Sequence, residues 1–202
     1  MKLHWSPKSP FVRKVMICAH ELDLVSRLQL VRSVAAMTKP NPDIMRDNPL
    51  SKIPTLVLDD GTTLFDSLVI CEYFNDLAGG ALFPKQAAHK WPALRWHAFA
   101  NGLLDILVLW RNEREKDPPL PTLLDAFAQK THASLAQFEK EATTLAAAPI
   151  SIGHVTVACM LGYLDFRFDD LGWRREAPRL AEWHRDFAVR PSYLATAPTL
   201  AE

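Results

Sequence analysis

Short runs of apolar residues in the first 80 positions give way to longer helical patterns in the rest of the chain. Residues 2–5 read as a strand, and a Ser-Pro turn follows them. Apolar residues then recur at helical spacing from Phe11 to Leu22. Residues 26–31 alternate enough to predict a second strand. These segments together predict a strand, a helix and a strand, the βαβ unit of a small sheet.

A β-hairpin and a helix are predicted next. The runs 55–58 and 62–65 flank Asp59-Asp60-Gly61, and Asp-Gly is the strongest short signal for a tight hairpin. A helix is expected from about Ser67 to the Gly79-Gly80 pair, because glycine commonly ends helices. The first part of the chain is therefore predicted to be a small mixed sheet covered by helices.

After Pro84 the pattern is helical and almost without strand signal. Helices are expected over residues 86–114, 122–147, 152–168 and 178–188. The third of these is apolar nearly all round, which predicts the buried centre of a helical bundle. We expect an α+β domain over residues 1–80, followed by an all-α domain over residues 86–202.

Composition and charge narrow the function classes. Lys and Arg total 23 and Asp and Glu total 23, so no basic excess favours nucleic acid as a partner. No apolar run approaches the roughly 20 residues of a membrane span, and no signal peptide is recognised. Cys18, Cys71 and Cys159 are widely spaced among apolar neighbours. We expect reduced core thiols in a cytoplasmic protein, with no metal site.

Ser9 and Pro10 stand where the first strand gives way to the first helix. Serine is a favoured N-cap and proline is favoured at the first helical position, so a purely structural interpretation suffices. A hydroxyl beside the positive end of a helix can also hydrogen-bond a thiolate and lower the pKa of a thiol. Both interpretations can hold at once.

Two further pairs carry the same ambiguity. A cis bond between Ile53 and Pro54 would turn the preceding backbone groups toward an extended ligand, whereas an edge-strand proline needs no ligand. Asp66 or Ser67 can simply cap the next helix. Alternatively, the carboxylate can bind an ammonium, while Ser67 and the helix N–H groups bind a carboxylate.

The order of these motifs is more specific than any one of them. Ser9 to Lys14, Asn48 to Leu56, Asp66-Ser67, Tyr163 to Arg167 and Trp183 to Pro191 together resemble the cytosolic glutathione S-transferases, in particular serine-type, bacterial-like members. The resemblance implies a thioredoxin-like N-terminal domain, an all-α C-terminal domain that contributes the electrophile pocket, and a homodimer. It places the active site in the cleft between the domains.

The resemblance also implies a role for each matching residue. Ser9 would stabilise the thiolate of glutathione, the co-substrate, and no metal is implied. The other implied contacts are the backbone of Ile53 before Pro54 for the cysteinyl part, Lys52 and Lys39 for the glycyl carboxylate, and Asp66 and Ser67 for the γ-glutamyl end. Lys39 lies in a variable loop.

One motif departs from the family pattern of Ser/Thr-x-x-Asp. The chain has Ser151-Ile152-Gly153-His154, in which His154 is expected to be a poorer reciprocal acceptor in the capping box. Gly153 lowers helix propensity by about 1 kcal/mol against alanine, so we expect lower stability with the fold kept. A buried His154 is expected to be a satisfied core histidine, although it could titrate near neutral pH.

Four residues of the long helix are further candidates. Asp105 stands in an apolar run, one turn after Asn101, and is expected to need a partner on a second helix or across a dimer interface. In some relatives, polar residues here touch the neighbouring subunit's glutathione. Trp110 and Arg111 could line the electrophile pocket, and ordinary core packing explains Trp110 equally well.

We therefore expect a glutathione transferase in which the thiolate attacks an electrophilic carbon of a hydrophobic small molecule, a detoxification reaction. The first alternative is a non-catalytic, dimeric glutathione-binding scaffold. The second is a glutathione-dependent thiol oxidoreductase, which Ser9 disfavours because a serine cannot form a mixed disulfide.

Overall fold

The computed structural model describes residues 1–200 and divides the chain into two compact units. Unit 1 comprises residues 1–83 together with the segment that begins at Pro191, and unit 2 comprises residues 84–190. The expected second domain of residues 86–202 therefore differs from unit 2 at its end. The segment after Arg190 packs with unit 1, where the short helix α9 (Pro191–Leu194) contacts α1 (Pro10–Glu21).

The predicted mixed sheet of unit 1 is confirmed and has the strand order β2-β1-β3-β4. Its strands are β1 (Lys2–Trp5), β2 (Gln29–Arg32), β3 (Thr55–Val57) and β4 (Thr63–Leu64). β1 pairs with β2 in parallel and with β3 antiparallel, and the hairpin pairs β3 with β4. β2 begins later than predicted, because Val25–Arg27 forms the 3-10 turn η1 instead.

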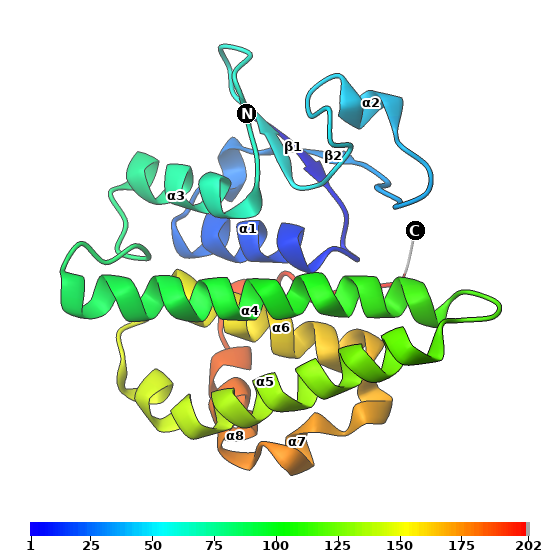
Figure 1. The fold of residues 1–202 in the computed structure, drawn as a ribbon. Helices are drawn as coiled ribbons and strands as arrows, with labels where there is room; N and C mark the ends of the chain where they lie inside the picture. The colour runs from blue at the N-terminus through cyan, green and yellow to red at the C-terminus, as the bar shows by residue number, and fades with distance from the viewer. Residues whose placement is uncertain (201–202) are drawn as a thin grey trace. The chain divides into compact units, whose positions relative to one another are not determined.

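Helices α1 and α3 (Ser67–Ala78) lie side by side on one face of this sheet (Figure 1). Val15 of α1, Ile70 and Phe74 of α3, and Leu3 of β1 are all fully buried. Helix α3 ends at Gly79 with φ +61°, a left-handed conformation that glycine adopts without a steric cost. The short helix α2 (Pro42–Met45) lies in the long connection between β2 and β3.

Unit 2 is helical, as predicted. Its helices are α4 (Ala87–Arg114), α5 (Pro121–Ala147), α6 (Ile152–Arg167), α7 (Trp173–Glu176) and α8 (Pro178–Ala188), with the 3-10 turn η2 (Asp169–Leu171) after α6. The expectation that the third long helix is the buried centre is confirmed, because every residue of α6 from Ile152 to Leu164 is buried. α6 packs along α4 (Figure 1).

Gly153 allows α6 to approach α4 closely. A Cβ atom at this position would lie 2.7 Å from the carbonyl oxygen of Ala93 and 3.0 Å from the Cβ of Trp96. Contacts that short do not occur without a shift of the backbone. Glycine at position 153 lowers helix propensity, but it allows α6 to pack closer to α4 than an alanine would permit.

The capping box at the start of α6 is complete, although His154 was expected to be a poorer reciprocal acceptor than the family's aspartate. Nδ1 of His154 accepts the backbone N–H of Ser151 at 3.1 Å, which completes the box. Its Nε2 donates to the carbonyl oxygen of Leu145 at 3.0 Å, a bond that an aspartate could not make. Burial lowers the pKa of His154, so the ring stays neutral rather than titrating near pH 7.

Asp105 has a hydrogen-bond partner on its own helix. It is exposed and accepts a hydrogen bond from Asn101 at 3.5 Å, one turn earlier on α4.

None of the helices within residues 1–200 is both long and apolar enough to span a bilayer.

Candidate functional site

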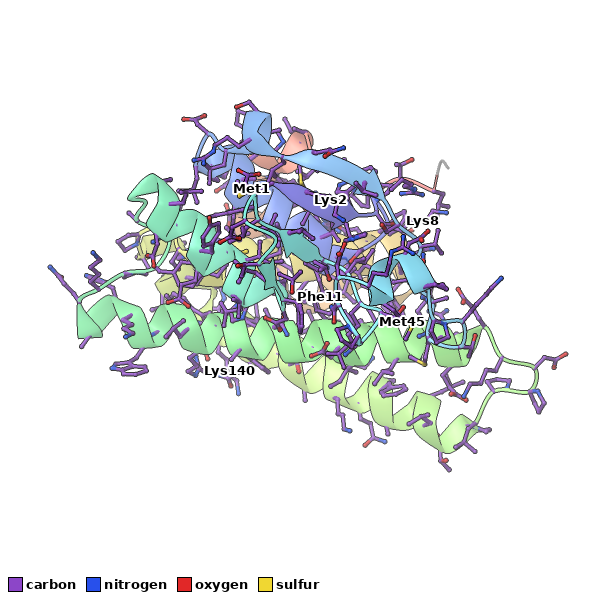
Figure 2. The ribbon with its side chains drawn as sticks, turned by 90° about the horizontal axis from the view of Figure 1, so that it is seen from above. Met1, Lys2, Lys8, Phe11, Met45 and Lys140 are labelled. Carbon is purple, nitrogen blue, oxygen red and sulfur yellow. The ribbon has the colours of Figure 1, made fainter. Side chains whose placement is uncertain are left out.

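The strand register of unit 1 brings the three candidate motifs to one end of the sheet. His4 of β1 lies opposite Thr55, and Leu64 of β4 lies opposite Leu56. The last residue of β1, the first residue of β3 and the last residue of β4 therefore lie at the same end of the sheet. Figure 2 shows β1 running from Met1 and Lys2 toward the end where Lys8 lies. Segments far apart in the sequence thus meet around the start of α1.

Ser9 is the N-cap of α1, as the structural interpretation predicts. Its Oγ accepts the backbone N–H of Val12 at 3.3 Å, and its backbone is extended, with φ −89° and ψ 121°. A hydroxyl that accepts one bond still has its own proton to donate. Within residues 1–200 no acceptor for the Ser9 proton is found. Capping therefore leaves this half-buried hydroxyl able to bind an anion at the helix N-terminus.

The Ile53–Pro54 peptide bond is cis, as predicted. β3 begins one residue after Pro54, so Ile53 lies outside the strand pairing. In the described part of the chain, no hydrogen bond engages the backbone N–H or carbonyl of Ile53. Both groups remain able to pair with an extended ligand in the manner of an added strand.

Asp66, and not Ser67, is the cap of α3. Its Oδ1 accepts the backbone N–H of Leu68 at 2.9 Å, and the residue is exposed. Ser67 is the first residue of the helix and is buried. A carboxylate and an N-terminal turn with free N–H groups therefore stand together, an arrangement that suits a ligand carrying both an ammonium and a carboxylate.

The two candidate lysines are placed differently. Lys52 directly precedes Ile53, and its carbonyl oxygen accepts bonds from Asn48 at 3.3 Å and from Thr55 at 2.8 Å. Its side chain is exposed beside the cis bond. Lys39 is exposed in the irregular segment before α2, and no polar contact fixes it within residues 1–200. The structure thus brings Lys52 to the site and leaves Lys39 unfixed.

Sequence reasoning missed the side chains that hold the segment carrying α2. His4 of β1 contacts Ser33 Oγ through Nδ1 at 2.8 Å and Asp47 Oδ2 through Nε2 at 2.7 Å. Lys2 donates to the same Asp47 oxygen at 2.6 Å. These hydrogen bonds, with that from His4 the largest cause, lower the pKa of Asp47. The sequence signal that could have revealed these contacts is His4, because a histidine within a short buried strand needs hydrogen-bond partners.

In unit 2, Trp110 is a core residue, because it is buried and its ring lies 4.9 Å from that of Phe168. Arg111 contacts Glu115 at 3.6 Å, but its buried Nε has no partner, and the same is true of Nε of Arg167. Burial raises the pKa of Tyr163, and the charges of these two arginines oppose that rise. Two buried arginine Nε–H groups, one near the C-terminal end of α4 and one at the C-terminal end of α6, therefore remain able to donate to a ligand.

No group of three or more His, Cys, Asp or Glu side chains that could hold a metal ion is found between residues 1 and 200.

Comparisons with known proteins agree with this geometry. Residues 8–77 match the family model for the glutathione S-transferase N-terminal domain, and residues 121–186 match the model for its C-terminal domain. The first match includes Ser9, the Ile53–Pro54 bond and Asp66.

Two similar solved structures are of a glutathione transferase family member from Pseudomonas fluorescens Pf-5. One, with bound glutathione, is 40% identical, covers 98% of this chain and 99% of its own, and has a TM-score of 0.94. The other, with bound S-(propanoic acid)-glutathione, is 39% identical and has a TM-score of 0.90. The match covers 99% of this chain and 100% of that chain.

The Escherichia coli K12 protein YibF, described as an uncharacterized GST-like protein, is 27% identical over 100% of both chains. The chain described in this structure belongs to the glutathione S-transferase family, in agreement with the resemblance and the fold expected from its sequence.

Proposed function

We propose that this protein is a glutathione transferase that joins the thiolate of glutathione to an electrophilic carbon of a small molecule. Ser9 and the N-terminus of α1 hold the sulfur as an anion. The backbone of Ile53 before Pro54 pairs with the cysteinyl part, Lys52 and Lys39 bind the glycyl carboxylate, and Asp66 and Ser67 bind the γ-glutamyl end.

The observation that carries this proposal is the Ser9 hydroxyl. It caps α1 as an acceptor, which leaves its proton for a thiolate placed at the positive end of the same helix. A free thiol with a pKa of about 8.5 is only a few per cent ionised at pH 7. Lowering that pKa to about 6–7 makes the thiolate a major form and supplies a rate factor on the order of ten or more.

The chemistry needs no other protein group. The sulfur lone pair forms the new carbon–sulfur bond, and either the leaving group departs with its electron pair or an activated alkene takes a proton from water. Burial of the reactants and their fixed orientation supply the remaining acceleration.

The second substrate is an electrophile bound by side chains of the helical unit. The relative crystallised with S-(propanoic acid)-glutathione holds a thioether that carries a carboxylate on its sulfur substituent. The unpartnered N–H groups of Arg111 and Arg167 support including carboxylate-bearing electrophiles, beside neutral hydrophobic ones, in a substrate screen.

We further propose that the protein acts in detoxification as a cytoplasmic homodimer. Cys18, Cys71 and Cys159 are buried and form no disulfide within residues 1–200, which fits a reducing compartment. The oxidoreductase alternative is disfavoured for two reasons. Residue 9 is a serine, which cannot form a mixed disulfide, and the three cysteines are buried and so not accessible to a disulfide substrate. A non-catalytic glutathione-binding scaffold is the remaining alternative, and thioether formation distinguishes it from the transferase.

Substitution of Ser9 tests the proposal. Ser9→Ala should lower kcat/KM for conjugation at least about tenfold and raise the pKa of bound glutathione toward its free value. Ser9→Asp keeps an N-cap acceptor but adds a negative charge beside the sulfur, so it should restore the melting temperature without restoring the rate. The measurements are conjugation rate against pH and thermal unfolding.

Ser26→Ala, at an exposed serine of η1, is the matched control and should leave rate and stability unchanged. If Ser9→Asp restores the rate together with the melting temperature, Ser9 is only a cap. If wild-type protein binds glutathione but forms no thioether with any electrophile in the screen, the scaffold alternative holds.

A further inference from the structure

A small cavity lies inside unit 1, between α1 and the segment that follows α9. Its volume is about 230 Å³, below the range of drug-sized pockets and sufficient for a small ligand. Its walls come from the end of β1 and the loop after it, from one face of α1, from β2 and η1, and from residues 195–197. None of the residues assigned above to glutathione lines it.

A buried arginine forms part of the cavity wall. Arg13 of α1 is only 7% exposed. Its Nη2 donates to the carbonyl oxygen of Tyr193 at 3.2 Å, and the guanidinium lies 3.8 Å from the centre of the Tyr193 ring. Its Nε is buried and has no partner, and within residues 1–200 Arg13 forms no ion pair. A buried cation with an unused donor calls for an anion to compensate it.

The rest of the wall has the same polarity. His20 is its other titratable residue, and Ser6 supplies a hydroxyl. Arg32 donates to that hydroxyl at 3.4 Å, while no Asp or Glu lines the cavity. The neighbouring carboxylate of Glu21 accepts a hydrogen bond from Ser192 and is not part of the wall. The cavity therefore has hydrogen-bond donors and positive charge without a resident counter-charge.

The remaining wall is apolar and sets the shape of the ligand. Trp5, Pro7, Met16 and Leu30 form surfaces that would pack against a compact hydrocarbon or aromatic body. A guanidinium pairs best with a planar carboxylate, which can accept two parallel N–H groups.

We propose that this cavity is a binding site for a small organic monocarboxylate with a compact apolar body, whose carboxylate pairs with Arg13. The site is separate from the proposed glutathione site and does not depend on transferase activity. Occupancy would tie the segment after α9 to α1, because Arg13 and residues 195–197 contact the same ligand.

Benzoate is the probe, and benzamide is its neutral counterpart of the same shape. Isothermal titration of the wild-type chain should show saturable benzoate binding that persists in saturating glutathione, with benzamide at least about tenfold weaker. Arg13→Gln should weaken benzoate binding by about tenfold or more, whereas Arg27→Gln, at an exposed arginine of η1, should not.

A second pair of variants leaves Arg13 in place. Ala195→Phe adds bulk to the cavity wall, and Leu194→Phe adds bulk to the exposed residue beside it, outside the wall. Only Ala195→Phe should lower the affinity, by about tenfold or more. This pair decides the question if Arg13→Gln fails to fold.

Three outcomes would overturn the proposal. They are the absence of saturable benzoate binding, equal binding of benzamide, and benzoate binding that glutathione abolishes while Ala195→Phe leaves it unchanged. The last would place benzoate in the proposed glutathione site. Loss of conjugation activity alone would bear on the proposed function and not on this cavity.

Discussion

Ser9, Asp66 and His154 each satisfy backbone groups at the N-terminus of a helix. Ser9 and Asp66 accept N–H groups of α1 and α3, and His154 accepts the N–H of Ser151 before α6. Ser9 and Asp66 retain capacity for a ligand, since one has an unused proton and the other is exposed. His154 has none left, because both ring nitrogens are bonded within the protein. All three residues cap or complete a helix N-terminus, but only Ser9 and Asp66 can still bind a ligand.

The buried ring of His154 should make stability depend on pH. Trp96 and Trp183 pack against it, and its partners are the backbone groups of Ser151 and Leu145. The pKa is lowered in the folded state, so the unfolded chain binds more protons below about pH 6.5. This residue therefore reduces the free energy of unfolding as the pH falls through that value.

His154→Gln should be less stable than wild type at about pH 7.5, and the difference should narrow by about 1 kcal/mol at about pH 5.5. Glutamine can still accept the Ser151 N–H but takes up no proton. Denaturant unfolding at the two pH values measures the change, with His89→Gln at an exposed position of α4 as the control. A constant difference between wild type and His154→Gln would show that His154 does not titrate on unfolding.

At the scale of elements, the connection between β2 and β3 depends on side chains rather than on regular structure. It contains only the four-residue helix α2 and carries both Lys39 and Lys52. Asp47 ties it to β1 through His4 and Lys2, and Asn48 ties it to Thr55 of β3 at 2.9 Å. These bonds hold Lys52 and Ile53 at the end of the sheet where Ser9 lies.

Asp47→Asn should lower the free energy of unfolding by about 1–2 kcal/mol, because charge-assisted hydrogen bonds to His4 and Lys2 are lost. If the proposed function holds, the KM for glutathione should rise with kcat little changed. The lowered pKa means that Asp47 stabilises the fold above about pH 4 and stops doing so as the pH falls through its folded value. The stability difference should therefore fade in acid.

Asp43→Asn, on α2 in the same connection, is the matched control. Asp43 pairs with Arg46, but both side chains are more than 70% exposed, so little stability should be lost. Chemical unfolding and steady-state kinetics measure both variants. Equal effects from the two substitutions would show that Asp47 has no special role in holding this segment.

At the scale of the whole molecule, both units expose large apolar side chains, and this exposure contributes no stabilising free energy to a monomer. Val69 and Leu77 of α3 are 43% and 37% exposed, and Trp91 of α4 is 64% exposed. Trp91 also lines a shallow groove with Leu94 and Trp96. Exposed apolar surface of this kind is typical of contact with another protein, and the proposed homodimer would cover it.

Sedimentation equilibrium of the purified chain should therefore give a mass near twice 22.8 kDa. Trp91→Ala should weaken self-association, because large buried aromatic residues dominate interface energies. Val189→Ala, at a residue 71% exposed after α8, should leave the mass unchanged. A single-chain mass at all protein concentrations would contradict the homodimer.

The sequence by itself determined the order of the strands and long helices, the mixed sheet, the central buried helix and the family, but not the short helices α2, α7 and α9. Those features rest on local signals: hydrophobic period, the Asp60-Gly61 turn, and the order of the Ser9, Pro54 and Asp66 motifs. Each is contained in a short stretch of chain, so no long-range contact was needed to read it.

Only the tertiary structure decided which alternative each motif takes and what surrounds it. The bond of His154 to Leu145, the close approach at Gly153, the tie between Asp47 and His4, and the packing of α9 on α1 all join residues distant in sequence or on separate elements. Such contacts depend on how the elements pack, and a local pattern of residues contains no information about which distant group will lie beside it.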